Sequence, residues 1–166
     1  MNPYLMLTTL FGLAVLQSTV MPRIHILGVH PDLMLMVVTS WSLLRGSEEG
    51  MLWALIGGAI VDLFSAAPFG VCTLSLLIVS FLSGLGERHI FRFDLLIPIL
   101  VIPVVSLVYG GLTLVLLRVL GWTAGWRDSL TQVLLPFSLV NTLLMPLVYL
   151  IMRTLYRRTA RKETSW

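Results

Sequence analysis

The chain has 166 residues, of which 57% are hydrophobic and only 11% are charged, and its formal net charge is +3. Soluble globular domains are about half apolar and about a quarter charged, so this composition excludes a water-soluble domain and, equally, a disordered chain. Five of the eleven Lys and Arg residues lie in the last fourteen positions rather than on a folded basic face. This distribution argues against a nucleic-acid-binding protein and leaves an integral membrane protein.

Uncharged windows of the chain predict its membrane-spanning helices, because one span needs about 20 apolar residues. The windows 1–22, 95–117 and 129–152 are long enough by themselves. The window 63–86 contains a turn sequence at 65–70, so its helix is expected to begin after that turn.

The segment 33–61 is ambiguous, because two windows of about twelve uncharged residues flank Arg45, Glu48 and Glu49. A re-entrant hairpin would bury these charges in hydrocarbon, at a cost of about 2.5–3.5 kcal/mol for each one. Two short spans would place the same charges in water, so we predict two spans here.

These windows together predict an all-α integral membrane protein with about six transmembrane helices. They form a single domain, 1–152, which is followed by a basic cytoplasmic tail, 153–166. The spans are expected at about 3–22, 30–45, 49–66, 70–86, 95–117 and 129–152.

The distribution of Lys and Arg predicts the orientation, since these residues are more frequent in cytoplasmic loops. With six spans and a cytoplasmic N-terminus, eight basic residues lie inside and three lie outside, the three being Arg23, Arg118 and Arg127. We therefore expect a multi-pass protein with both termini in the cytoplasm.

Span three contains a stripe of small residues that ends in a carboxylate. Gly50, Ala54, Gly58 and Asp62 recur at every fourth position, with Gly57 beside them, so they share one helix face. Small residues allow close approach of helices in membranes, which makes this stripe a candidate packing or partner interface. For Asp62 three interpretations remain open: a cap for the turn at 65–70, a contact with a partner helix or ligand, and a proton relay.

Two further polar residues are candidates for the same packing or partner interface. Asp32 follows Pro31, and a proline followed by an acid is an ordinary signal for the start of a helix. Asn141 lies near the middle of span six, where an amide seeks a hydrogen bond to another helix. Internal packing is the simplest interpretation of Asn141, and a role in a ligand pocket is the alternative.

The sequence contains no recognisable reactive centre. Its single cysteine, Cys72, lies in an apolar run, and its three histidines have no spacing typical of a zinc site. Neither a Gly-x-Ser-x-Gly nucleophile motif nor a phosphate-binding loop occurs. We therefore expect no catalytic residues, no bound metal and no cofactor.

A series of short motifs runs through the first half of the chain: Leu16-Gln17-Ser18-Thr19-Val20-Met21-Pro22, Ile26-Leu27-Gly28, Pro31-Asp32-Leu33, Leu44-Arg45-Gly46, Gly50, Gly57-Gly58, Asp62-Leu63 and Pro68-Phe69-Gly70. With these motifs the chain resembles the bacterial rod shape-determining protein family MreD, and its length, span number and tail agree with that resemblance.

The resemblance implies a component of the cell-elongation machinery in the bacterial inner membrane, which regulates cell shape. It implies association with MreC, with the RodA polymerase and its partner transpeptidase, and with MreB filaments during lateral peptidoglycan synthesis. It also implies a fold similar to the six-helix substrate-binding component of energy-coupling-factor transporters. Asp32, Gly57 and Asp62 would then serve helix packing or partner docking.

The leading hypothesis is a non-enzymatic membrane scaffold that docks the transmembrane helix of MreC. The alternative is a small-molecule-binding carrier subunit of a membrane transporter, whose pocket Asn141 and Asp62 would line. A third possibility is a protein that binds or handles membrane lipids.

Overall fold

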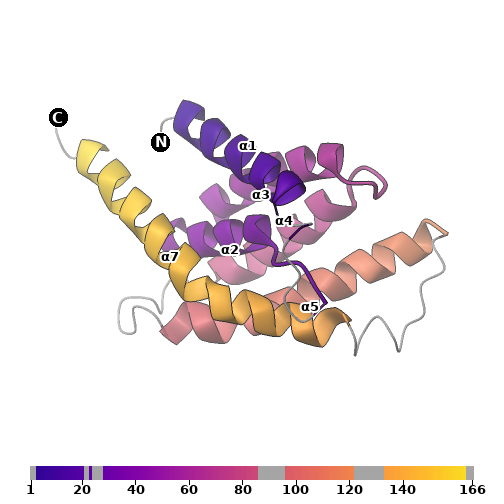
Figure 1. Ribbon diagram of the computed structural model, residues 1–166. Coiled ribbons are helices and arrows are strands. Elements are labelled where there is room, and N and C mark those ends of the chain that lie inside the picture. Colours follow the sequence, from indigo (N-terminus) through magenta and orange to yellow (C-terminus); the bar gives the residue numbers. More distant parts are fainter. Residues whose placement is uncertain (1–2, 21–22, 24–27, 86–95, 122–132, 164–166) are drawn as a thin grey trace.

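The computed structural model describes residues 3–20, 23, 28–85, 96–121 and 133–163, and the described part of the chain is all-α (Figure 1). This confirms the predicted all-α class and the expected number of helices, although Arg127 and the ends of several predicted spans lie outside these residues. The six helices are α1 (Pro3–Thr19), α2 (Leu33–Arg45), α3 (Ser47–Phe64), α4 (Val71–Gly84), α5 (Leu96–Val119) and α7 (Leu135–Glu163).

Two of these helices contain segments long and apolar enough to cross a membrane, namely Ile97–Val119 and Leu135–Arg157. Three other apolar segments are shorter: Met6–Thr19, Leu33–Arg45 and Val71–Gly84. Helix α3 has 18 residues but carries two acids in its first turn and a third near its end. The helices of the first half are therefore distinctly shorter than α5, which has 24 residues.

Helix α7 does not end where the predicted basic tail begins. It runs without interruption from Leu135 to Glu163, although Pro146 lies inside it. The expected boundary at residue 152 thus falls within a continuous helix, because straight-chain basic residues favour the helical conformation as well as Leu does.

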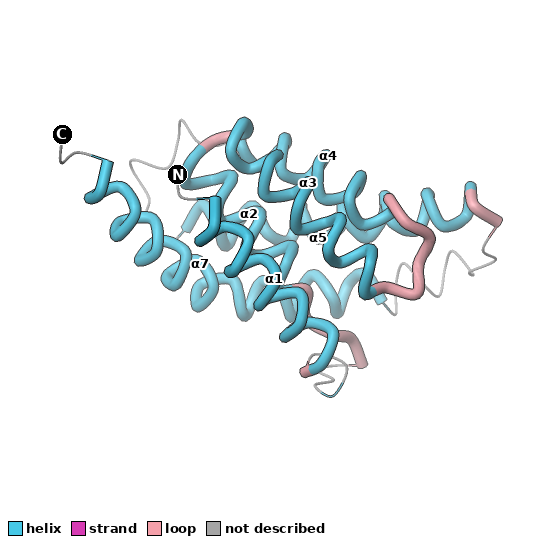
Figure 2. The backbone as a smooth tube through the Cα atoms, turned by 90° about the horizontal axis from the view of Figure 1, so that it is seen from above, coloured by secondary structure: helices cyan, strands magenta, loops and turns pink. Residues whose placement is uncertain are grey.

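Helix α2 occupies the centre of the bundle and packs against all five other helices (Figure 2). Every residue from Met34 to Leu43 is buried. A single glycine, Gly46, separates α2 from α3, and its φ of 88° lies in the left-handed region that other residues rarely adopt. The chain therefore reverses sharply between these two short helices.

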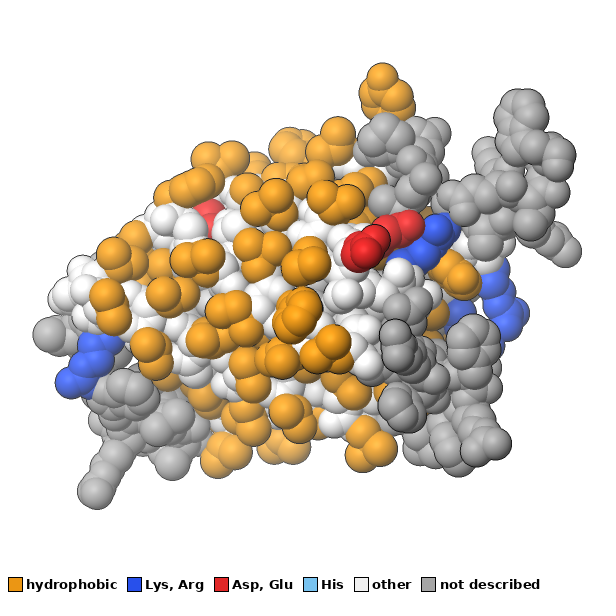
Figure 3. All heavy atoms as spheres, turned by 180° about the vertical axis from the view of Figure 1, so that it is seen from behind, with side chains coloured by type: hydrophobic (Ala, Val, Ile, Leu, Met, Phe, Trp, Pro, Cys, Tyr) orange, Lys and Arg blue, Asp and Glu red, His pale blue; other side chains and the backbone are white. Residues whose placement is uncertain are grey.

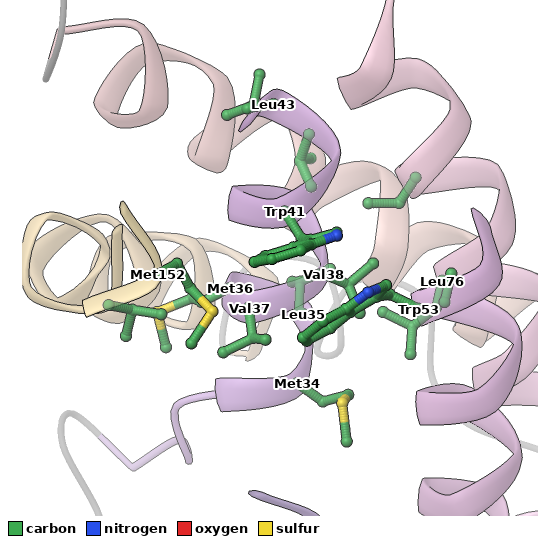
Figure 4. Packing of buried hydrophobic residues seen from close by; sticks show 14 of the residues in the cluster. Met34, Leu35, Met36, Val37, Val38, Trp41, Leu43, Trp53, Leu76 and Met152 are labelled. Carbon is green, nitrogen blue, oxygen red and sulfur yellow. The ribbon is translucent and has the colours of Figure 1, made fainter. Parts of the chain in front are cut away.

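The core is built on two tryptophans from neighbouring helices (Figure 4). Trp41 of α2 and Trp53 of α3 stack with ring centroids 4.4 Å apart, and both are about 1% exposed. Around them lie Met34, Leu35, Val38 and Leu76. Stacked rings of this kind contribute about 0.5–1.5 kcal/mol beyond the area they bury.

The outer surface is mainly apolar. Figure 3 shows one face on which hydrophobic side chains fill the middle and charged side chains gather toward the two ends. Helix α1 begins and helix α7 ends at the same end of the bundle (Figures 1 and 2).

Glycines allow α3 and α4 to approach closely at both ends of their contact. A Cβ atom on Gly58 of α3 would lie 2.6 Å from the Cα atom of Thr73 of α4. A Cβ atom on Gly84 of α4 would likewise collide with the backbone of Ser47 of α3. The antiparallel pair is therefore held closely together at two points along its length.

The close contact at Gly58 should make this position intolerant of any side chain. Gly58→Ala should lower the free energy of unfolding by about 1–3 kcal/mol, because a collision with backbone must push the two helices apart. Thermal unfolding in detergent, followed by circular dichroism, would measure the effect.

Gly111→Ala is the matched control, because a Cβ atom at Gly111 of α5 meets nothing within 4 Å. It should leave the unfolding temperature unchanged or raise it, since Ala is the better helix former. Equal losses in the two variants would contradict the assigned contact.

Candidate functional site

Polar side chains from four helices meet around the beginning of α2. We call this group the Asp32 cluster, and it comprises Gln17 of α1, Asp32 at the start of α2, Ser106 of α5 and Asn141 of α7. Asp32 is 8% exposed, and Ser106 and Asn141 are fully buried. The cluster therefore lies inside the bundle, where every polar group needs a partner.

Helix α2 begins close to the position that Pro31 and Asp32 predicted, but Asp32 is its N-cap rather than an acid of its first turn. Its Oδ1 atom accepts a hydrogen bond from the backbone N–H of Leu35 at 3.0 Å and another from Nε2 of Gln17, also at 3.0 Å. Gln17 in turn accepts the backbone N–H of Met34 through Oε1 at 2.8 Å. Two side chains thus satisfy two N–H groups that the first turn of a helix leaves unpaired.

Asn141 connects this helix start to the other half of the chain. Its Oδ1 atom accepts the backbone N–H of Asp32 at 3.1 Å, and its Nδ2 atom donates to Oγ of Ser106 at 3.1 Å. Tyr109, which is nearly buried in α5, is a further polar neighbour of Asp32. The amide of Asn141 therefore holds α2, α5 and α7 together at one point.

Asp62 forms a second cluster at the beginning of α4. The N-cap of that helix is Gly70, which has a φ of 102° and no side chain to satisfy the first turn. Asp62 supplies the missing acceptor: it receives the backbone N–H groups of Gly70, Cys72 and Thr73, each at 3.0 Å, and the hydroxyl of Thr73. A carboxylate at this position also interacts favourably with the helix dipole.

Of the three interpretations of Asp62, the cap of the turn at 65–70 is the one that these hydrogen bonds support. The carboxylate is 4% exposed, and its two oxygens are shared among four donors. The two acids singled out by the sequence thus each serve the beginning of a helix: Asp32 is the N-cap of α2, and Asp62 reaches from α3 to the beginning of α4.

The small residues of α3 lie inside the chain rather than on its surface. Gly50, Ala54, Gly57 and Gly58 are all buried. Their nearest neighbours belong to this chain: Ser42 and Ser80 at Gly50, Met34 and Leu10 at Gly57, and Thr73 at Gly58. The stripe is therefore divided among several internal contacts, and an additional helix could reach it only by displacing α1, α2 or α4.

A third polar group, at the opposite end of α2, was not singled out by the sequence. Arg45 and Glu49 form an ion pair at 3.2 Å, and Nε1 of Trp41 donates to Oε2 of Glu49 at 3.3 Å. The guanidinium of Arg45 lies 5.0 Å from the ring centroid of Tyr156 in α7, within the range of a cation–π contact. The spacing of Arg45 and Glu49, four residues apart across a glycine, is the signal that could have shown this pair.

The arrangement around the clusters fits structure rather than chemistry. Among the described residues, no group of three His, Cys, Asp or Glu side chains could hold a metal ion. Cys72 is buried. The polar atoms of the Asp32 cluster and of Asp62 form hydrogen bonds with other groups of this chain, and these bonds hold the helices in place.

The hydrogen bonds of Asn141 should make this side chain important for stability. Asn141→Leu removes the partner of a buried backbone N–H and of a buried hydroxyl, and should cost about 1–3 kcal/mol of unfolding free energy. Thr142→Val is the matched control, because the Thr142 hydroxyl bonds only to the Ser138 carbonyl of its own helix. That variant should change the unfolding free energy by less than about 0.5 kcal/mol, and a larger loss than in Asn141→Leu would contradict the cluster.

The capping role of Asp62 predicts a graded response to substitution. Asp62→Asn keeps one acceptor oxygen and should destabilise the protein less than Asp62→Ala, which removes every acceptor. Limited proteolysis at the turn 65–70 would measure this, with cleavage fastest in Asp62→Ala and slowest in the unmodified chain. If Asp62→Ala resists protease as well as the unmodified chain does, Asp62 does not hold the start of α4.

Comparison with known proteins extends the structural findings. No curated protein and no solved structure matches the chain. A family model does match, that of the rod shape-determining protein MreD, and it covers residues 1–159. This match spans nearly the whole chain and includes all of the clusters described above, so the chain belongs to the MreD family of membrane proteins, which takes part in determining rod shape.

Proposed function

We propose that this protein is a non-enzymatic membrane scaffold of the bacterial cell-elongation machinery. In this proposal it crosses the inner membrane several times with both termini in the cytoplasm, and it docks the transmembrane helix of MreC. It would thereby help to organise lateral peptidoglycan synthesis together with RodA, its transpeptidase partner and MreB filaments. The family match supports the role in cell shape, and the common end of α1 and α7 supports an even number of crossings.

The main support for the proposal is that the polar side chains face the interior of the bundle. Asp32, Asp62 and Asn141 all form hydrogen bonds inside the bundle, and the side chains exposed along the helices are mainly large and apolar. A surface of this kind suits contact with lipid and with a partner's transmembrane helix. The same direction disfavours the carrier alternative, since Asn141 and Asp62 are the groups that a ligand pocket would have used.

Because the small residues of α3 are buried inside the chain, we expect the docking surface for MreC on other helices. Helix α1 packs mainly against α2 and α3, and its side chains Leu7, Phe11 and Val15 are exposed. Gly12 lies on this helix, and a Cβ atom there would meet nothing within 4 Å. A Cβ atom at Gly111 of α5 would likewise meet nothing within 4 Å. A partner helix packed against either glycine could approach the backbone closely.

Two leucine substitutions test which of these faces docks the partner. Gly12→Leu and Gly111→Leu should both preserve the fold, because the space around each glycine is open. In affinity purification from native membranes, the variant on the docking face should retain at most about one tenth of the MreC that the unmodified chain retains. A tenfold loss of affinity corresponds to about 1.4 kcal/mol of binding free energy. The other variant serves as its control.

The purification needs one further comparison, with Gly58→Leu. This change breaks the α3–α4 contact inside the chain, so any loss of MreC should be accompanied by a lower unfolding temperature. If MreC does not co-purify with the unmodified chain, the scaffold proposal fails. If it co-purifies equally with both surface variants, docking takes place on a different face.

A further inference from the structure

Helix α7 is longer than the hydrocarbon region of a membrane is thick. Its 29 residues extend about 43 Å at about 1.5 Å per residue, whereas the hydrocarbon of a bilayer is about 30 Å thick. Figures 1 and 2 show the C-terminal end of α7 projecting past the ends of the other labelled helices. The last turns of α7 therefore extend beyond the bundle.

A contact with the end of α2 marks the level at which α7 leaves the hydrocarbon. Arg45 is the last residue of α2, and its guanidinium lies 5.0 Å from the ring centroid of Tyr156. Glu49, which pairs with Arg45, and Glu48, which is exposed, follow directly in the chain. Charged side chains are costly in hydrocarbon, so this end of the bundle lies at the level of the lipid headgroups. Tyr156 lies at the same level because it contacts Arg45.

The exposed face of α7 changes from leucine to arginine at this level. Leu143, Leu150 and Arg157 follow one another at intervals of seven residues, which is close to two helical turns, so they share one face. All three side chains are exposed. Arg153 lies one turn before Arg157 and is partly exposed. A lipid whose acyl chains pack along these leucines therefore brings its own phosphate to the two arginines.

Positive charge continues to the end of the helix. From Arg153 onward, five of the six charged residues are basic, and α7 contains all five: Arg153, Arg157, Arg158, Arg161 and Lys162. Basic residues at the membrane surface attract negatively charged lipids. Residues four apart are neighbours on a helix, and a guanidinium can bind two phosphate oxygens at once. Arg153 and Arg157 are therefore placed to bind one phosphate together.

We propose that the C-terminal part of α7 is a binding site for an anionic glycerophospholipid. Arg153 and Arg157 bind its phosphate, and its acyl chains lie along Leu143 and Leu150. An acidic segment of a soluble protein is the competing occupant, and the lipid is favoured because one lipid molecule contacts the leucines and the arginines at the same time. This inference rests on the membrane crossing within the proposed function and not on the docking of MreC.

Lipid binding by the isolated full-length chain tests the site. The chain would be purified in an uncharged detergent and offered phosphatidylglycerol or phosphatidylcholine with identical acyl chains, and the bound lipid would be counted by native mass spectrometry. Phosphatidylglycerol should bind at least about tenfold more tightly, because the site contains two arginines. Arg157→Gln should reduce this preference about fivefold, and the double variant with Arg153→Gln should remove it.

Arg118→Gln is the matched control, because Arg118 is also an exposed arginine in the last turn of a long helix, α5. It removes the same charge and should leave the preference unchanged. Arg157→Lys keeps the charge but loses the paired donors, so its preference should lie between those of the unmodified chain and Arg157→Gln. Unfolding temperatures without added lipid should be the same in all of the single variants at 157 and 118, since both side chains are exposed.

Three results would overturn the inference. The first is equal binding of the two lipids, and the second is an equal loss of preference in Arg157→Gln and Arg118→Gln. The third is displacement of phosphatidylglycerol by soluble glycerol phosphate or by a glutamate-rich peptide at the same concentration, which would show that the acyl chains contribute nothing. The outcomes remain separable from those of the proposed function: capture of MreC without a lipid preference would refute only the lipid site, and a lipid preference without capture of MreC would refute only the scaffold.

Discussion

The structure depends on hydrogen-bond partners for the backbone N–H groups at the beginning of α2, which lies inside the bundle. A helix that starts within a water-poor region leaves backbone N–H groups unpaired, and each such group is costly without a partner. Here the carboxylate of Asp32 and the amides of Gln17 and Asn141 supply the missing partners from three helices. Since α2 touches every other helix, fixing its first turn also fixes the positions of α1, α5 and α7.

The backbone N–H groups at the beginning of α4 need hydrogen-bond partners in the same way. A glycine at its N-cap permits the sharp turn after α3 but provides no acceptor, so Asp62 reaches across from α3 to serve three backbone N–H groups. The glycine contacts at Gly58 and Gly84 then bring the two helices together. The acid and the glycines therefore act jointly, and the close approach of the helices is what brings Asp62 within reach of its donors.

These internal roles connect the fold to the family's part in rod shape. The hydrogen bonds of Asp32, Asp62 and Asn141 lie inside the bundle, and the surface left for other molecules is mainly apolar. On that surface, Gly12 and Gly111 are positions at which another helix could approach the backbone closely.

The sequence by itself determined the all-α class, the number of helices in the described residues, the family and the helix start at Asp32. These follow from local quantities, namely the length of uncharged windows, a proline followed by an acid, and residues recurring along one helix face. Only the tertiary structure decided the partners of Gln17, Asn141 and the small residues of α3. The bond between Asp32 and Asn141 joins positions far apart in the chain, and periodicity along one helix shows which residues share a face without showing which helix covers it. For the same reason the sequence left open whether the stripe serves internal packing or a partner, and in the structure its neighbours belong to this chain.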